Sequence, residues 1–308
     1  MPDAIPVRPI LKWAGGKRQL LPRLRPYYPK TFSRYLEPFL GSGAVFLDLH
    51  NSGALEGREV RLSDINTDVI GCYRAVRDDV EAVIEELERL AARYRKCGTR
   101  AYYAVRDSRF NPERRRVHAS AAAASSYSAA LAAMLIFLNR TGFNGLFRVN
   151  ARGEFNVPAG RQTNPRICDS ENLRAWSRTL RRPGVSVEAV PYDRALADAR
   201  DGDFIYLDPP YAPVSATARF TSYTAKGFGA AEQTALQRLV VDVAGRGALV
   251  LLSNSAAPEI RQLYARSVCV RGAGLRATTV AARRAINSRP SGRGSVREYL
   301  ITNLSRRA

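Results

Sequence analysis

The sequence has few of the residues that metal and redox sites need. Its 308 residues include two histidines and four cysteines. The cysteines are spread along the chain, at Cys72, Cys97, Cys168 and Cys269. None of them forms a C-x-x-C pair, so we expect no zinc site and no bound metal. Four isolated thiols also fit a reducing compartment, in which disulfides are rare.

Long apolar runs are missing as well. No stretch approaches the roughly 20 apolar residues that a membrane-spanning helix needs. Residues 1–11 lack the apolar segment of a secretory signal peptide. We therefore expect a cytoplasmic protein that has no membrane partner.

Positive charge, in contrast, is in large excess. The chain has 48 Lys and Arg against 28 Asp and Glu, which gives a formal net charge of +20. An excess of this size predicts a polyanionic partner, and a merely solvated basic surface is the alternative. Most of the cations are arginines, whose forked guanidinium binds phosphates and base edges better than a lysine ammonium does.

Three regions of the chain differ in pattern. Short apolar runs alternate with turn residues in 1–68, and a similar alternation of strands and helices returns in 182–308. This rhythm predicts an α/β fold with a doubly wound, mostly parallel sheet. Residues 69–181 have a mainly helical pattern. We expect 1–68 and 182–308 to form one catalytic domain and 69–181 to form an inserted helical domain.

Individual elements follow from periodicity and turn residues. Strands are expected at residues 35–36, 60–62, 185–190, 204–207, 248–252 and 298–302. Helices are expected at residues 44–49, 80–94, 121–138 and 231–244. Two alternating runs, 146–149 and 154–157, flank a glycine-containing turn and predict a β-hairpin. The polar, basic stretch 109–118 is expected to be a loop.

The strongest chemical signal is Asp208-Pro209-Pro210-Tyr211, directly after an apolar run. Two consecutive prolines cannot continue a central strand, so the chain leaves the sheet at its carboxyl edge, where open α/β sheets bind ligands. An amine entering this turn meets two acceptors, the Asp208 carboxylate and the Pro209 carbonyl. Tyr211 offers a face on which a planar base can stack. A strand-ending turn without chemistry is the alternative for the tetrapeptide alone.

Two further motifs predict a nucleotide-like cofactor. Glu37, Phe39 and Gly41 lie in Glu37-Pro38-Phe39-Leu40-Gly41-Ser42-Gly43, where glycines permit a tight turn and close approach of a ligand. Asp64 ends the next strand and is an acceptor for a pair of ribose hydroxyls. The phosphate loop G-x-x-x-x-G-K-[ST] is absent, which favours a cofactor without phosphates, such as S-adenosylmethionine.

A third motif, Lys12-Trp13-Ala14-Gly15-Gly16-Lys17, lies near the start of the chain. Its lysines, indole and glycines suit a pocket for a carboxylate, with Lys17 on the carboxylate of a methionine moiety and Trp13 packed beside it. An N-terminal segment with a core tryptophan is the alternative.

Together these motifs resemble the DNA adenine methylase (Dam) family, which includes the enzymes that modify GATC. The resemblance runs from residue 11 to residue 303. Its other matching segments are Ser63-Asp64-Ile65-Asn66, the runs 138–150 and 153–158, residues 212–223, Leu252-Ser253-Asn254 and Arg283-Arg284. Phe143 and Phe147 depart from the family pattern, because some relatives have Tyr and Arg there, and the basic stretch 109–126 is longer than that pattern requires.

The resemblance implies the roles of matched residues. Trp13, Lys17, Asp64 and Asp208 match cofactor contacts, and 208–211 match the catalytic turn. The hairpin matches a DNA-reading element, and a two-stranded ribbon fits the major groove. The matched positions are Phe143 and Asn144 near a flipped adenine, Leu146 intruding into the base stack, Arg148 and Arg161 on bases, and Lys12 facing DNA beside the pocket. A solvated basic hairpin is the alternative.

The activity that this resemblance implies is methyl transfer from S-adenosylmethionine to N6 of adenine in double-stranded DNA, by base flipping and direct in-line attack, with GATC as the expected site. The same fold acting on cytosine N4 or on an RNA adenine stays open, as does a non-catalytic nucleic-acid-binding relative. A nuclease is not favoured, because no metal-binding carboxylate cluster is found in the sequence. We expect a monomer or a weak dimer, acting alone or beside a restriction enzyme.

Overall fold

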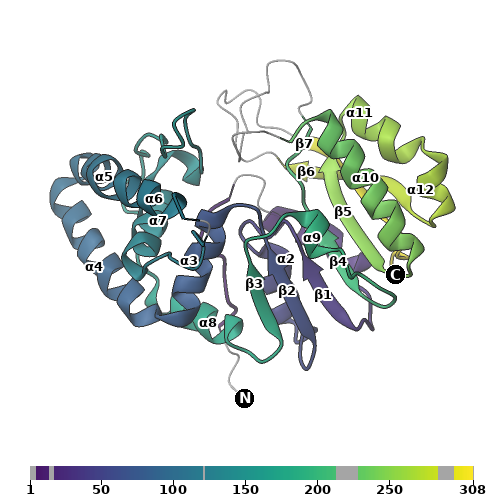
Figure 1. Cartoon of the computed structure of the whole chain (residues 1–308), viewed down its shortest axis with the longest axis horizontal. Coiled ribbons are helices and arrows are strands. Elements are labelled where there is room, and N and C mark those ends of the chain that lie inside the picture. The colour runs from purple at the N-terminus through teal and green to yellow at the C-terminus, as the bar shows by residue number, and fades with distance from the viewer. Residues whose placement is uncertain (1–4, 14–16, 121, 213–227, 284–294, 308) are drawn as a thin grey trace. The chain divides into compact units, whose positions relative to one another are not determined.

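The computed structural model describes residues 5–13, 17–120, 122–212, 228–283 and 295–307 (Figure 1). Contacts divide the chain into two compact units. The first comprises Met1–Gly16, Gly41–Ala54 and Asp64–Ala189, and the second comprises Lys17–Leu40, Leu55–Ser63 and Val190–Ala308.

One seven-stranded sheet has the order β3-β2-β1-β4-β5-β7-β6. Its strands are β1 (Arg34–Glu37), β2 (Glu59–Ser63), β3 (Val185–Glu188), β4 (Phe204–Leu207), β5 (Leu249–Ser255), β6 (Arg276–Arg283) and β7 (Ser295–Thr302). Strand β1 pairs in parallel with β2 and β4, and β4 pairs in parallel with β5. Strand β7 is antiparallel to both β5 and β6. The predicted doubly wound, mostly parallel sheet is therefore confirmed.

The strand order reverses between β1 and β4, which is the switch point at which such sheets bind ligands. Strand β1 ends at Glu37 and β4 ends at Leu207, so both predicted motifs begin at the carboxyl ends of these two strands. All six predicted strands are present. Strand β6 was not predicted, because its Arg-Ala-Thr-Thr-Val-Ala-Ala-Arg run has no marked apolar alternation.

The helices of the second unit are η1 (Lys17–Gln19), α1 (Leu21–Leu24), η2 (Arg25–Tyr27), α9 (Tyr192–Ala195), α10 (Ala230–Gly245), α11 (Pro258–Ile260), η5 (Arg261–Ala265) and α12 (Val268–Gly272). Helix α10 matches the predicted helix 231–244 and lies beside β5 (Figure 1). Its buried Leu236 and Val240 belong to one core with Ile205 of β4 and Val250 of β5. Burying each such side chain contributes about 1.5–3 kcal/mol, so this core holds the carboxyl ends of β4 and β5 in place.

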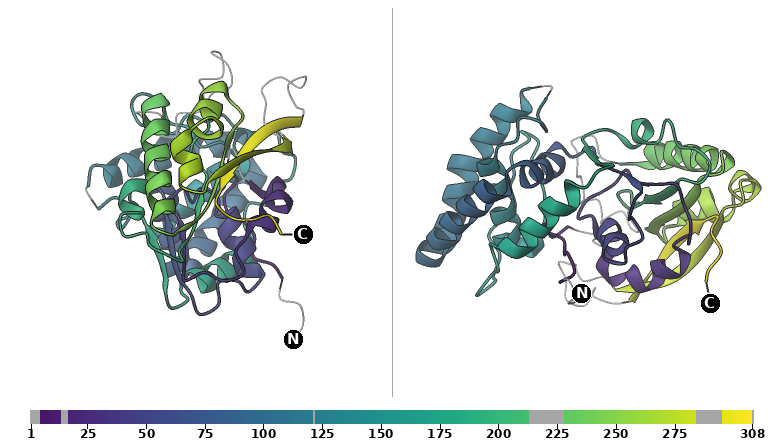
Figure 2. Two further views of the ribbon diagram at one scale, coloured as in Figure 1. Left: turned by 90° about the vertical axis from the view of Figure 1, so that its right-hand side faces the viewer. Right: turned by 90° about the horizontal axis from the view of Figure 1, so that it is seen from below.

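The first unit is mainly helical. It contains α2 (Ala44–Asn51), α3 (Thr67–Asp78), α4 (Val80–Cys97), α5 (Thr99–Val105), η3 (Arg106–Phe110), α6 (Asn111–His118), α7 (Ala129–Thr141), η4 (Phe143–Gly145) and α8 (Ser170–Leu180). Helix α7 contacts α3, α4 and α5 (Figures 1 and 2). Its residues 131–139 are all buried. No helix in the described ranges is long and apolar enough to cross a membrane.

Two of the sequence predictions in this unit were wrong. The stretch 109–118 is helical and not a loop, because Phe110 and Val117 are buried, Pro112 stands in the first turn of α6, and Glu113 pairs with Arg116. The predicted helix 121–138 begins only at Ala129, where the Ser128 hydroxyl accepts a hydrogen bond from Leu131 N–H. Residue 121, its expected start, lies outside the described residues.

The predicted hairpin is present as a looser ribbon. Residues 142–160, called the 142–160 hairpin below, fold back on themselves with antiparallel bridges at Val149–Phe155 and Gly142–Ala159. The predicted continuous strands 146–149 and 154–157 are not formed. The Asn111 side chain is hydrogen-bonded to both backbone groups of Phe155. Asn111 Oδ1 accepts from the Phe155 N–H at 2.9 Å, and Asn111 Nδ2 donates to the Phe155 carbonyl at 3.1 Å.

Candidate active site

The Asp208 carboxylate lies in the second unit, directly after the fully buried strand β4. Lys17 Nζ is 2.7 Å from Asp208 Oδ1, and the Ser253 hydroxyl donates to the same oxygen at 3.1 Å. Among the described residues none is hydrogen-bonded to Oδ2. Burial raises the pKa of Asp208, and the Lys17 ammonium opposes this shift. The predicted residues Lys17 and Asp208 are therefore in contact, and one carboxylate oxygen can accept a further donor.

The two proline carbonyls after Asp208 differ in their hydrogen bonding within the described part of the chain. Gln233 of α10 donates to the Pro210 carbonyl at 2.9 Å and is itself bonded by Asn254 at 3.0 Å. The Pro209 carbonyl accepts no hydrogen bond from the described part of the chain. Gln233 is almost fully buried. It was not found from the sequence, because nothing in an amphipathic helix distinguishes a buried glutamine that points toward a turn.

The Tyr211 ring is fixed at its hydroxyl. Its Oη donates to Glu298 of β7 at 2.7 Å, and Lys17 Nζ lies 4.5 Å from the ring centroid. Burial raises the pKa of Tyr211 well above its ordinary value, so the ring stays neutral. Glu298 was also missed, since only the order of the strands in the sheet brings β7 near this turn.

Glu37 and Phe39 are the other predicted cofactor residues in the second unit. Glu37 is buried at the end of β1, and Tyr35 donates to its Oε2 at 2.7 Å. Phe39 stacks on Tyr192 with ring centroids 5.3 Å apart. Both residues are thus held by neighbours at the switch-point end of the sheet.

Trp13, Gly41 and Asp64 come together in the first unit. Gly41 N–H donates to Asp64 Oδ2 at 2.9 Å, and Tyr73 Oη donates to the Gly41 carbonyl at 2.7 Å. Gly41 has a positive φ of 46°, and an added Cβ would lie 2.8 Å from Trp13 Cδ1, so only glycine fits here. Ile65, directly after Asp64, is 56% exposed.

Two opposing effects act on the Asp64 carboxylate. Burial raises its pKa to about 6, while backbone N–H groups, from Asn66, Gly41 and Ile65, act in the opposite direction. Ile65 was not predicted as a site residue. The signal was available, since an exposed apolar side chain next to an acidic strand end suits a base beside its ribose.

Lys12 and the start of the 142–160 hairpin are tied together by Asn139 of α7. Asn139 Oδ1 accepts from Lys12 N–H at 2.7 Å, and its Nδ2 donates to the carbonyls of Lys12 and Gly145 at 2.8 and 3.0 Å. Trp13 stacks on Phe147 with centroids 5.7 Å apart. Phe147, which departs from the family pattern, is therefore a buried packing residue here.

The other hairpin residues differ in exposure. Phe143 is 41% exposed, Arg148 and Arg161 are exposed, and Asn144 and Leu146 are half-buried. Asn144 has a positive φ of 54°, and all other described non-glycine residues have a negative φ. Arg148 Nε donates to Asn156 Oδ1 at 2.8 Å. Phe143, Asn144, Leu146 and Arg148 are thus on one ribbon whose start is strongly bent, and Arg161 directly follows the last residue of that ribbon.

Several matched positions cannot be placed. Residues 14–16 and 213–223, together with Arg284, lie outside the described residues.

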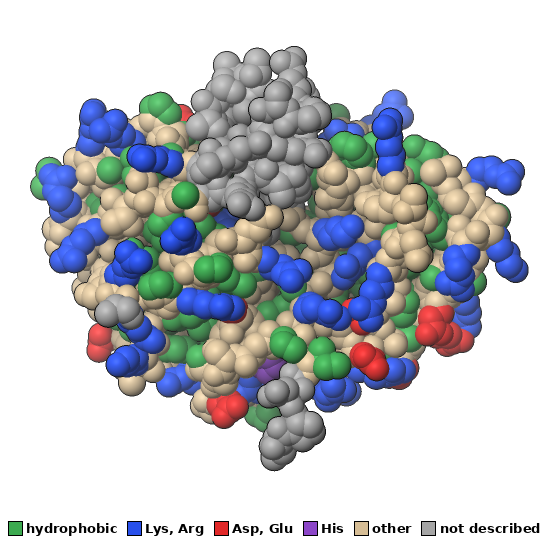
Figure 3. All heavy atoms as spheres, turned by 180° about the vertical axis from the view of Figure 1, so that it is seen from behind, with side chains coloured by type: hydrophobic (Ala, Val, Ile, Leu, Met, Phe, Trp, Pro, Cys, Tyr) green, Lys and Arg blue, Asp and Glu red, His purple; other side chains and the backbone are tan. Residues whose placement is uncertain are grey.

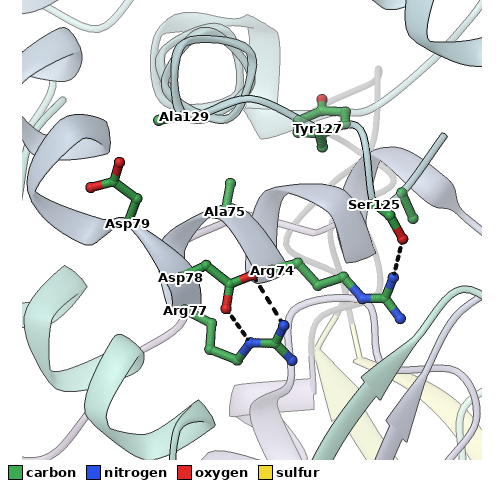
Figure 4. Close-up of a pocket in the computed structure, with 9 residues that line it drawn as sticks. Arg74, Ala75, Arg77, Asp78, Asp79, Ser125, Tyr127 and Ala129 are labelled. Atoms are coloured by element: carbon green, nitrogen blue, oxygen red, sulfur yellow. Dashed lines mark hydrogen bonds and ion pairs between the residues drawn. The ribbon is translucent and has the colours of Figure 1, made fainter. Parts of the chain in front are cut away.

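A cavity of about 260 Å³ in the first unit holds none of the predicted site residues. It is lined by Arg74, Ala75, Arg77, Asp78, Asp79, Ala124, Ser125, Tyr127 and Ala129 (Figure 4). Arg74 is bonded to Ser125 and to a backbone carbonyl, and Arg77 is paired with Asp78, so both guanidinium groups are engaged. No group of three or more His, Cys, Asp or Glu within the described ranges is placed to hold a metal ion.

Positive side chains are spread widely over the face of the molecule in Figure 3. On the face in Figure 3, Lys and Arg side chains clearly outnumber Asp and Glu. This surface agrees with the net charge of +20 and with a polyanionic partner.

Comparison with known proteins places the chain in a family. The family described as "D12 class N6 adenine-specific DNA methyltransferase" matches residues 13–280. The chain is 34% identical over 301 residues to the Type II methyltransferase M1.LlaDCHI of Lactococcus lactis subsp. cremoris, covering 98% of this chain and 97% of that protein. It is 34% identical over 297 residues to the DNA adenine methylase of Escherichia coli strain K12, covering 95% and 94%.

A third relative matches a somewhat shorter part of the chain. The Type II methyltransferase M.MjaIII of Methanocaldococcus jannaschii is 38% identical over 258 residues, which cover 81% of this chain and 84% of that protein. These matches extend along nearly the whole chain and agree with the switch-point fold and with the turn after β4. The chain therefore belongs to the D12 class of N6 adenine-specific DNA methyltransferases.

Proposed function

We propose that this enzyme methylates N6 of adenine at a specific site in duplex DNA, with GATC as the expected sequence. The family supplies the enzyme class, the DNA substrate and S-adenosylmethionine as the methyl donor. The single observation that supports the proposed chemistry is the turn 208–211, where Asp208 Oδ2 and the Pro209 carbonyl are both without a partner among the described residues. An exocyclic amine has two N–H groups, which match these two acceptors.

The proposed mechanism begins with a flipped adenine. Unstacking and unpairing a base costs a few kcal/mol, and stacking on Tyr211 together with two hydrogen bonds offsets much of that cost. One N6–H donates to Asp208 and the other to the Pro209 carbonyl. Both hydrogen bonds draw the nitrogen lone pair out of conjugation with the ring and direct it at the methyl group.

When bound, S-adenosylmethionine supplies an electrophilic methyl group on a sulfonium, so that the N6–C bond forms as the C–S bond breaks. The methylated amine then loses a proton to Asp208 or to water. Because burial raises the pKa of Asp208, its carboxylate is a better proton acceptor than an exposed one. The protein otherwise acts by positioning the reactants. No covalent enzyme intermediate is needed, and burial raises the pKa of the Cys72 thiol far above neutrality.

The cofactor contacts are proposed from two groups of residues. In the first unit, Asp64 accepts hydrogen bonds from the ribose hydroxyls, Ile65 offers an apolar face to the adenine ring, and Gly41 allows close approach. Trp13 packs beside the methionine moiety. In the second unit, Lys17 binds the methionine carboxylate, and Glu37, Phe39 and Asp208 complete the contacts. These residue types fit the charged, hydroxylated and aromatic parts of this cofactor.

The 142–160 hairpin is the proposed reading element. Leu146 intrudes into the base stack, Phe143 and Asn144 lie near the flipped adenine, and Arg148 and Arg161 bind base edges. Lys12 joins them, since Asn139 ties its backbone to the hairpin. We propose that the enzyme acts as a monomer or weak dimer, and that residues 1–68 with 182–308 carry the chemistry while 69–181 read DNA.

Methylation of purified substrates tests the chemistry. Duplex DNA, duplex with adenine replaced, and an RNA of the same sequence are incubated with the enzyme, and the methylated base is identified by mass spectrometry. We expect N6-methyladenine in duplex DNA alone. N4-methylcytosine, or preferential methylation of RNA, would contradict the proposal. Sequencing that detects N6-methyladenine in a host expressing the enzyme gives the site, and methylation at sites lacking GAT would refute the assignment of the hairpin.

Replacement of Asp208 tests its role. We expect Asp208→Ala to abolish methylation while duplex affinity stays within about threefold, because the carboxylate acts on the amine and not on the DNA backbone. The matched control is Asp193→Ala, which removes an acidic residue of α9 whose side chain forms no ion pair or hydrogen bond within the described part of the chain. Substantial turnover by Asp208→Ala would refute the role.

A further inference from the structure

The basic stretch 109–118 contains four arginines, and each of them is bonded to an acidic side chain of the described residues. Its exposed arginines are already paired: Arg109 with Glu86 at 2.6 Å, Arg115 with Glu154 at 2.5 Å and Arg116 with Glu113 at 2.6 Å. Exposed ion pairs of this kind are weak, but each of them neutralises a charge that would otherwise attract a DNA phosphate. The remaining arginine of the run, Arg114, points inward, and its side chain is only 11% exposed.

Arg114 binds a carboxylate that is almost completely buried. Its Nε lies 2.9 Å and its Nη2 2.8 Å from Asp68 Oδ2, and the Asp68 side chain is 1% exposed. Two further groups face Asp68: His118 Nε2 at 3.1 Å and the Tyr127 hydroxyl at 3.4 Å. Breaking a buried, hydrogen-bonded pair leaves an uncompensated charge, so the geometry of this pair is strongly maintained.

The same guanidinium reaches the hairpin. Arg114 Nη1 donates to the Gly153 carbonyl, at the turn of the 142–160 hairpin. The next residue, Glu154, pairs with Arg115, and Phe155 is bonded at both backbone groups by Asn111. Three consecutive hairpin residues are therefore bonded to one short helix, α6, through the backbone of Gly153 and Phe155 and through the side chain of Glu154. The buried Phe155 ring also packs on Phe110 and Phe147.

We call the contacts that join Asp68, Arg114 and Gly153 the Arg114 brace. Its Asp68 end lies beside the cofactor motif. Asp68 stands in the first turn of α3, whose N-cap Asn66 accepts from the backbone N–H groups of Asp68 and Val69. Asn66 N–H in turn donates to Asp64 Oδ1 at 2.9 Å. A continuous set of hydrogen bonds thus runs from Asp64 through Asp68 and Arg114 to Gly153, entirely within the first unit.

We propose that Arg114 is a positioning residue that holds the turn of the 142–160 hairpin in register with Asp64, and that it thereby determines how well the enzyme discriminates its recognition sequence. This inference rests on the proposed reading role of the hairpin. Arg114 touches neither cofactor nor DNA. It acts through the Gly153 carbonyl at the turn of the hairpin, so its loss misplaces base-reading side chains while the acceptors at Asp208 are unchanged.

The test compares Arg114→Met with Arg116→Met. Both remove a guanidinium from α6 and keep an unbranched side chain, but Arg116 is 72% exposed and pairs only with Glu113 among the described residues. KM and kcat are measured on a duplex carrying the recognition sequence and on duplexes with one base pair changed, and S-adenosylmethionine affinity is measured by calorimetry. Arg148→Ala serves as the positive control for loss of discrimination.

We expect Arg114→Met to lower the discrimination ratio by about 10²-fold, which is the effect of misplacing a positioned group by about 1 Å. The loss appears mainly in KM for the cognate duplex, cofactor affinity stays within about twofold, and Arg116→Met resembles the parent enzyme. Arg114→Lys keeps a charge opposite Asp68 but lacks the fork, so it should fold and yet recover only part of the discrimination. This variant carries the test where Arg114→Met fails to fold.

Three results would overturn the inference. If both Arg114 variants keep parental discrimination while Arg148→Ala loses it, the brace has no role in reading, although the proposed function stands. If the Arg114 variants lose cofactor affinity and kcat in parallel with discrimination, the residue is merely structural. If Arg148→Ala also leaves discrimination unchanged, the hairpin is not the reading element, and both the inference and that part of the proposed function fail.

Discussion

Gly41 gives the sharpest test of how the cofactor turn is built. Replacing it with alanine has two separable costs. The residue has a φ of 46°, and placing an L-residue in this left-handed region costs roughly 1–2 kcal/mol. The new Cβ would also lie 2.8 Å from Trp13 Cδ1, closer than van der Waals contact allows, and such overpacking costs about 1–3 kcal/mol. Gly41→Ala should therefore lower the free energy of unfolding by about 2–5 kcal/mol.

A second glycine separates these two costs. Gly57 also has a positive φ, 67°, but an added Cβ there meets nothing within 4 Å. Gly57→Ala should therefore cost only the backbone strain, about 1–2 kcal/mol, and should leave cofactor affinity unchanged. Gly41→Ala should in addition weaken S-adenosylmethionine binding by about 10- to 100-fold, because 1.4 kcal/mol of displaced contact corresponds to a factor of ten.

The assay combines urea unfolding with calorimetric titration of S-adenosylmethionine. The double variant Trp13→Ala/Gly41→Ala removes the clash but keeps the backbone strain. Relative to Trp13→Ala alone, the added Gly41→Ala substitution should therefore cost only about 1–2 kcal/mol. The reasoning is refuted if Gly41→Ala binds the cofactor like the parent enzyme, or if Gly57→Ala is as destabilising as Gly41→Ala.

Two further predictions concern the supports of the site. Gln233→Leu removes the hydrogen bond to the Pro210 carbonyl, so kcat should fall by about tenfold while DNA affinity stays unchanged. The control Gln237→Leu lies on the same helix, but Gln237 is bonded at 3.4 Å to Leu263 and Ser267, and this variant should resemble the parent enzyme. Equal kcat values for the two variants, measured by single-turnover methylation, would contradict the role of Gln233. The Asp64 pKa of about 6 predicts opposite pH trends. A folded-state pKa above the unfolded value contributes stability that is present at low pH and lost as pH rises through about 6, while cofactor affinity, which needs the carboxylate, should fall as pH drops from 7 to 5. Titrations at both pH values check this, and affinity that is independent of pH would exclude Asp64 as the ribose acceptor.

Much of the sheet could be predicted from the sequence, because its central strands are short apolar runs bounded by turns. Strand β4 is buried at every position and was found with its bounds. The turn after it followed from two prolines, whose missing N–H groups end a ladder. The α/β rhythm also placed Asp64 at the end of β2. These are local properties, and local patterns report them well.

The missed residues share a different property. Gln233 and Glu298 contact the turn 208–211 from elements that are distant in the sequence. Gln233 lies 23 residues from its partner Pro210, and Glu298 lies 87 residues from its partner Tyr211. Their positions depend on which strand lies next to which, and the reversal of β7 between β5 and β6 is not visible in any short segment. A sequence can show that a polar residue is present at a strand end, but the sheet order decides which turn it contacts.

The error at residues 109–118 has another physical cause. The stretch has many charges, and solvated charge is typical of loops, yet here the charges satisfy one another. Arg114 compensates Asp68 in the interior, while Arg115 and Arg116 pair with glutamates at the surface. When the arginines of a helix are paired with carboxylates of the same unit, the helix adds little to the electrostatic attraction for DNA, even if its composition is basic. The net charge therefore agrees with the DNA substrate of this family, but it does not show where DNA binds, because only the fold determines which guanidinium groups are paired.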